Sequence, residues 1–83
     1  MSSKPPKVVI RKLGREKALG IAYTDHNQIH IDPRQKIAKN RFDTEIHEFL
    51  HIRFPDWSET KVRKEAKAMR DFLWGLKYRK VSL

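Results

Sequence analysis

Three short segments in the first half of the chain have the hydrophobic pattern of β-strands. Apolar residues dominate segments 8–13 and 18–24, and segment 28–32 alternates two isoleucines with polar side chains. Alternation over so short a stretch is typical of a strand with one buried face. Turn-forming residues occupy 25–27, and Pro33 ends the third segment. The pattern therefore predicts three strands, with Gln28, His30 and Asp32 on the polar face of the last one.

The hydrophobic period then changes to that of a helix. Apolar residues recur on one helical face, with Asn40 or Asp43 as the candidate N-terminal cap and Pro55 as the stop. These apolar residues are Phe42, Ile46, Phe49 and Leu50.

A second apolar stripe follows Pro55, with steps of four and three residues that again predict a helix. Asp56 or Ser58 can cap it, and Asp56 with Glu59 has the spacing of a capping box. Gly75 lies near its expected end. The stripe consists of Val62, Ala66, Met69, Leu73 and Leu76.

These elements predict one α+β domain with a β-β-β-α-α order, in which a small sheet packs with two helices. Residues 7–83 form this domain. Residues 1–6 are polar and contain two prolines, so we expect a flexible N-terminus there. No apolar run resembles a signal peptide or a membrane span. We expect a monomeric, cytoplasmic protein without a membrane partner.

Composition limits the chemistry of any metal site. The chain of 83 residues contains no cysteine, which excludes disulfides and thiolate zinc sites. Metal ligands must come from His, Asp or Glu.

Nineteen Lys and Arg residues against ten acidic residues give a formal net charge of +9, which favours polyanions such as nucleic acid.

The segment His47-Glu48-Phe49-Leu50-His51 matches the pattern H-E-x-x-H on a predicted helix. Residues four apart lie on one helical face, so His47 and His51 can bind the same ion. Zinc binds imidazole nitrogen and, in catalytic sites, three protein ligands and a water. Glu48 lies beside the ion without binding it, and can take a proton from the zinc-bound water.

The third ligand has two candidates on the second predicted helix. Glu59 and Glu65 lie on opposite flanks of its apolar stripe, and both can face inward. We prefer Glu59 because it follows the Pro55 bend and is therefore closer in the chain to His51. Glu59 can instead serve in a capping box, and Glu65 can be a surface carboxylate paired with a neighbouring cation.

Other polar residues near the motif have weaker assignments. Asp43 precedes His47 by one turn, so it either accepts a hydrogen bond from the His47 ring or interacts with the helix dipole as an N-terminal acid. His30 either lines a cleft or faces solvent from its strand. Tyr23 and Tyr78 are the only phenols that can stabilise an oxyanion, and nothing in the sequence places them near the ion.

The segments 29–33, 43–51 and 54–59 together resemble small metallopeptidase-like proteins of bacteria and their phages. These proteins belong to the zincin superfamily, near the SprT-like and minimal gluzincin groups. The resemblance covers roughly residues 18–76. It implies that the strand before the motif helix, here Gln28–Asp32, is the edge strand that aligns an extended substrate. The chain lacks a second subdomain, which implies a shallow cleft.

The sequence thus predicts a zinc metallopeptidase-like hydrolase that acts on a peptide or protein. His47, His51 and Glu59 are the expected Zn²⁺ ligands, and Glu48 is the catalytic base. The alternative is a basic nucleic-acid-associated module in which the zinc site is structural or vestigial.

Overall fold

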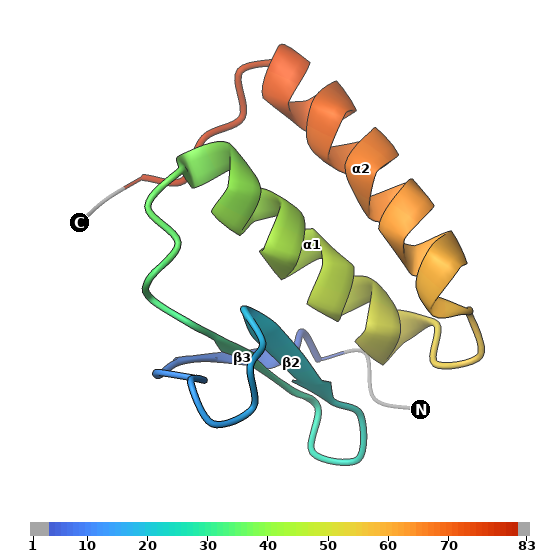
Figure 1. The fold of residues 1–83 in the computed structure, drawn as a ribbon. Helices are drawn as coiled ribbons and strands as arrows, with labels where there is room; N and C mark the ends of the chain where they lie inside the picture. Colours follow the sequence, from blue (N-terminus) through green and yellow to red (C-terminus); the bar gives the residue numbers. More distant parts are fainter. Residues whose placement is uncertain (1–3, 82–83) are drawn as a thin grey trace.

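The computed structural model describes residues 4–81 and contains three short strands followed by two helices (Figure 1). The predicted β-β-β-α-α order and α+β class are confirmed. Residues 1–3 and 82–83 lie outside the described residues, so the predicted flexible segment 1–6 and domain 7–83 are each described only in part. The elements are β1 (Lys7–Ile10), β2 (Gly20–Tyr23), β3 (Gln28–Ile31), α1 (Ala38–Arg53) and α2 (Glu59–Gly75).

The strands form one mixed sheet in the order β1-β3-β2. β1 pairs with β3 in parallel, and β2 pairs with β3 in an antiparallel hairpin whose turn contains Asn27 at a φ of 51°. Both sides of β3 are therefore hydrogen-bonded. The prediction that residues 28–32 form a substrate-aligning edge strand is wrong, because β1 passes to the far side of β3 instead of pairing with its neighbour in sequence. The edge strand next to the helices is β2.

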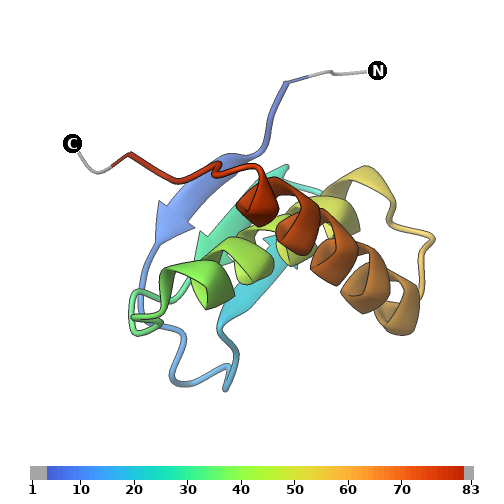
Figure 2. The same ribbon diagram turned by 90° about the horizontal axis from the view of Figure 1, so that it is seen from above.

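The elements stack in three layers, with α1 in the middle. α1 packs on β2 and β3, whereas α2 packs on α1 and does not reach the sheet. Figure 2 shows β1 at one edge of the sheet, outside the part that α1 covers. The alternation predicted for β3 is confirmed, since Ile29 and Ile31 are 3% and 0% exposed.

The core between the helices uses only part of the two predicted apolar stripes. Leu50, Val62 and Ala66 are buried, while Met69 is 43% exposed. Because α2 has a single neighbouring layer, it buries a narrower stripe than a helix enclosed on two sides. Phe49 and Leu76, also expected in the stripes, are exposed as well.

The helix ends correct the predicted cap of α1 and decide between the two candidate caps of α2, of which Ser58 is confirmed. α1 begins at Ala38 after an N-cap residue, Ile37, that makes no side-chain cap, so Asn40 and Asp43 lie within the helix. α2 is capped by Ser58, whose Oγ accepts a hydrogen bond from the Lys61 N–H at 3.1 Å, and this excludes the capping box of Asp56. The cap holds the first turn of α2 in place directly after the bend between the helices.

Asp32 also departs from its predicted place on a polar strand face, because it follows β3 and its side chain is fully buried. Its Oδ2 accepts the Leu13 N–H at 2.8 Å, and its Oδ1 accepts the Arg34 N–H at 2.8 Å. Hydrogen bonds from the Arg34 side chain, followed by the bond from Leu13, hold the pKa of Asp32 well below its ordinary value. Asp32 thereby fastens the segment between β1 and β2 to the end of β3.

Candidate metal centre

His47 and His51 lie one turn apart on α1 and turn the same ring nitrogen towards each other. Their Nε2 atoms are 3.2 Å apart. The two side chains are 15% and 23% exposed, which places them at the wall of a cleft rather than in the core. The four-residue spacing of the motif therefore places both imidazoles on one face of α1, as predicted.

Glu59 completes a three-residue cluster. It is the first residue of α2, directly after the N-cap residue Ser58. One carboxylate oxygen lies 2.7 Å from His47 Nε2 and the other lies 2.8 Å from His51 Nε2. The candidate ligand atoms of the three residues all lie within 4.8 Å of one another.

Glu65 is not part of this cluster. It lies six residues further into α2, about 9 Å along the helix axis. Among residues 4–81, the cluster of His47, His51 and Glu59 is the only group of His and carboxylate side chains close enough to hold one ion. The geometry therefore favours Glu59 over Glu65 as the third candidate ligand.

The electrostatics of Glu59 suit a metal ligand. Partial burial acts to raise its pKa, but the nearby His47 and His51 and their hydrogen bonds outweigh burial, and the net pKa is lowered. Glu59 is thus held in the ionised form that metal coordination requires.

The donor set fits a zinc ion. Two ligands at about 2.0–2.1 Å from a tetrahedral ion are separated by roughly 3.3 Å, close to the 3.2 Å between the two imidazole nitrogens. Two imidazoles and one carboxylate leave a fourth position open, as in catalytic zinc sites. The hydrogen bonds between Glu59 and the imidazoles use the same atoms that an ion would bind.

Glu48 lies next to this cluster but on the side of α1 that faces the sheet. It is 9% exposed, and burial raises its pKa although His47 and His51 act in the opposite direction. Among the described residues no group donates a hydrogen bond to its carboxylate. Its oxygens therefore remain available to a water molecule in the cleft, and its raised pKa makes it a better proton acceptor than an exposed carboxylate.

Gly20, which the sequence did not single out, sets the position of Glu48. A Cβ at this position of β2 would lie 2.7 Å from Thr44 Cγ2, 2.9 Å from Glu48 Cγ and 3.1 Å from Glu48 Oε2. Only glycine lets α1 approach β2 this closely. The available signal was a glycine inside a predicted strand, which often marks a close approach of another segment.

We expect Gly20→Ala to push the Glu48 side chain out of its place and to destabilise the fold by about 1–3 kcal/mol, as overpacking does. Thermal unfolding and peptide hydrolysis would measure the two effects. Gly14→Ala is the matched control, because a Cβ there meets nothing within 4 Å. Equal stability of Gly20→Ala and wild type would contradict the close packing described here.

A cleft of about 480 Å³ opens between the cluster and β2. Its walls combine the polar side chains of the site with the backbone of β2, an edge strand whose outer side pairs with no other strand of residues 4–81. The lining residues are Gly20, Ile21, Ala22, Thr24, His47, Glu48, His51, Pro55 and Glu59.

Asp43 adopts neither of its predicted roles. α1 has no acidic residue in its first turn, so Asp43 is not an N-terminal acid. Its Oδ1 pairs instead with Arg70 Nη1 of α2 at 3.4 Å, and this contact links the two helices rather than orienting His47.

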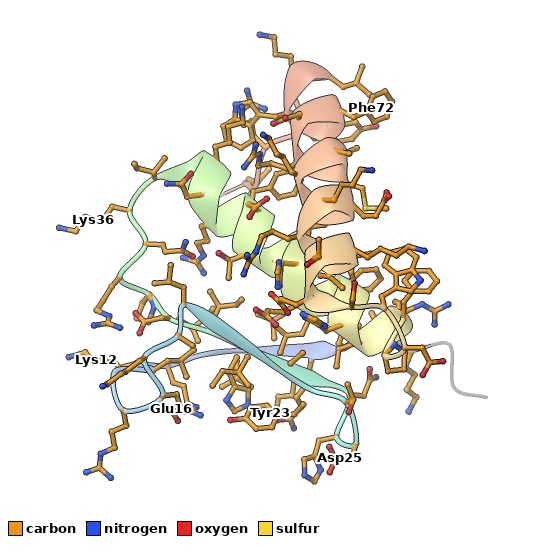
Figure 3. All side chains as sticks on the ribbon, turned by 45° about the vertical axis from the view of Figure 1, so that its right-hand side comes forward. Lys12, Glu16, Tyr23, Asp25, Lys36 and Phe72 are labelled. Carbon is orange, nitrogen blue, oxygen red and sulfur yellow. The ribbon has the colours of Figure 1, made fainter. Side chains whose placement is uncertain are left out.

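His30 and the two tyrosines lie away from the cleft. The His30 Nδ1 accepts a hydrogen bond from Arg11 Nε at 2.7 Å, and its ring centroid is 4.6 Å from that of Tyr23. Burial, followed by the charge of Arg11, lowers the pKa of His30. Tyr23 projects from the side of the sheet opposite the helices (Figure 3). Neither Tyr23 nor Tyr78 lines the cleft.

No protein-family model, curated protein or solved structure matches the chain. No helix within residues 4–81 has the length and apolar character needed to span a membrane.

Proposed function

We propose that the chain is a zinc-dependent metallopeptidase-like hydrolase with His47, His51 and Glu59 as ligands and Glu48 as general base. The observation that carries the proposal is the convergence of three suitable ligand atoms beside a buried carboxylate to which no residue of the described part of the chain donates a hydrogen bond. Zinc bound by these ligands would lower the pKa of water and polarise a carbonyl. Glu48 would accept the proton of the attacking water and deliver it to the leaving amine.

The edge strand suggests the shape of the substrate. Within residues 4–81, β3 is the only strand that pairs with β2, and the β2 residues Gly20, Ile21 and Ala22 line the cleft. An extended peptide could add to the outer edge of β2 with its main chain, which places a carbonyl beside the cluster. β2 thus takes the substrate-aligning role assigned from the sequence to residues 28–32, because both edges of β3 are already paired.

The experiment that tests the proposal measures metal content and hydrolysis on the same preparation. We expect one zinc per chain, and cleavage of an unstructured protein such as casein that chelation stops and added zinc restores. His47→Ala and His51→Ala should lose both the metal and the activity.

The possible outcomes distinguish an enzyme from a protein with a structural or vestigial zinc site, and from one with no metal site. Equal zinc content in wild type and both variants would remove the metal site. Zinc lost from both variants, together with no cleavage by zinc-loaded wild type, would favour a structural or vestigial zinc site over an enzyme.

A further inference from the structure

A second groove, of about 900 Å³, lies at the other end of the helix pair. It is bounded by the start of α1, the end of α2 and the segment that follows α2, which runs back across the start of α1 (Figure 1). Arg41 in this groove and His51 in the metal centre are ten residues apart on α1, or about 15 Å. The groove is therefore separate from the site proposed above.

Positive charge dominates the groove. Lys36, Arg41, Arg79 and Lys80 line it together with one acid, Glu45. Glu45 is already paired, with Lys80 Nζ at 3.1 Å and Arg41 Nε at 3.7 Å. Within residues 4–81, Lys36 and Arg79 form no ion pair. Figure 3 shows Lys36 projecting outward from the connection before α1.

Aromatic side chains line the groove together with these cations. Trp74 lies 6.0 Å from Phe42 between ring centroids, and the Arg79 guanidinium stacks 3.5 Å above the Trp74 ring. Arg79 Nη1 also donates to the carbonyls of Trp74 and Tyr78, which holds the guanidinium against the end of α2. Tyr78 is 61% exposed. Flat surfaces of this kind, a guanidinium plane and an exposed phenol, are what unpaired bases stack on.

Two polar atoms of residues that line the groove are fully enclosed by the protein. Gln35 Oε1 and Arg41 Nε are buried and have no hydrogen-bond partner among the described residues. Both residues line the groove. Arg41 Nε lies 3.7 Å from the Glu45 carboxylate, so within residues 4–81 Gln35 Oε1 is the one of the two without a polar partner, and it suits a donor such as a base N–H.

We propose that this groove binds single-stranded nucleic acid, with the backbone held by Lys36 and Arg79 and a base stacked on Tyr78. A duplex keeps its bases stacked inside, where Tyr78 cannot reach them. An acidic peptide would satisfy the cations but has no ring to place on the aromatic surfaces. The formal net charge of +9 adds long-range attraction for a polyanion.

The test uses fluorescence anisotropy of a labelled single-stranded oligonucleotide of about ten nucleotides, titrated over a series of salt concentrations. Tyr78→Ala should weaken binding about tenfold through the loss of one stacked base. The double variant Lys36→Glu/Arg79→Glu should weaken binding more, and should reduce the slope of log affinity against log salt by about 1.4, or 0.7 for each lost phosphate contact.

The matched control is Lys64→Glu/Lys67→Glu, which makes the same charge change on exposed residues of α2 outside the groove. It should stay close to wild type in affinity, and circular dichroism should show all variants folded. The proposal is overturned if the control loses as much affinity as the groove variant, because binding is then spread over the basic surface. It is equally overturned by undetectable binding at low salt, by unchanged affinity in Tyr78→Ala, or by polyglutamate or duplex binding as tightly as the single strand.

Discussion

Glu48→Gln should reduce peptide hydrolysis by about 10²- to 10⁴-fold, the usual contribution of a positioned general base, while zinc content stays at the wild-type level. The amide has the size of the carboxylate but cannot accept the proton of the attacking water. Zinc should remain because Glu48 is not among the residues whose ligand atoms converge. Initial rates on casein and metal analysis of the same sample would check both halves of the expectation.

The fold of this variant should be at least as stable as that of wild type. Burial raises the pKa of Glu48, which means that the ionised carboxylate is costly at this position and a neutral amide avoids the cost. Glu65→Gln is a suitable control for the effect of removing one charge. Undiminished cleavage by Glu48→Gln would refute its role as the base.

The second large effect is expected at the ligand from α2. Glu59→Gln should weaken zinc affinity by roughly a hundredfold or more, since changing a partner that only supports a ligand already costs 10- to 100-fold. A neutral amide oxygen is a poor substitute for a carboxylate on a divalent cation. Competition with a chromophoric chelator would measure the affinity, and hydrolysis at limiting zinc should fall in parallel.

Glu65→Gln distinguishes this interpretation from a general effect of lost negative charge on α2. It removes a carboxylate from the same helix, outside the cluster, and should leave zinc affinity unchanged. If Glu65→Gln lost zinc and Glu59→Gln kept it, the ligand assignment would be reversed although Glu48 could still be the base.

The sequence predicted the parts of the molecule that depend on local spacing. The four-residue interval between His47 and His51 fixes their relation on any α-helix, and the alternation around Ile29 and Ile31 fixes the buried face of β3. Glu59 was preferred for its short chain distance from the motif, and the structure places it against both imidazoles. These features need no knowledge of how distant segments pack.

The features that the sequence did not predict depend on tertiary contacts. The order of the strands could not be read from three short apolar segments, because nothing local shows that β1 pairs with β3 and not with β2. The start of α1 was misplaced because the helix has no side-chain cap. The neighbouring sequence predicts a role at the helix for Asp43 and a place on the polar face of a strand for Asp32. Their actual partners, Arg70 and the Leu13 N–H, come from distant segments.

The site has two halves that belong to different parts of the fold. Its three candidate ligands come from α1 and the first residue of α2, only twelve positions apart in the chain, so closing that loop has a small entropic cost. The proposed base, Glu48, in contrast owes its burial to β2, where it packs closely against Gly20. If the proposed function holds, a helical hairpin would acquire its ion early in folding, whereas Glu48 would become a competent base only once the sheet has docked against α1.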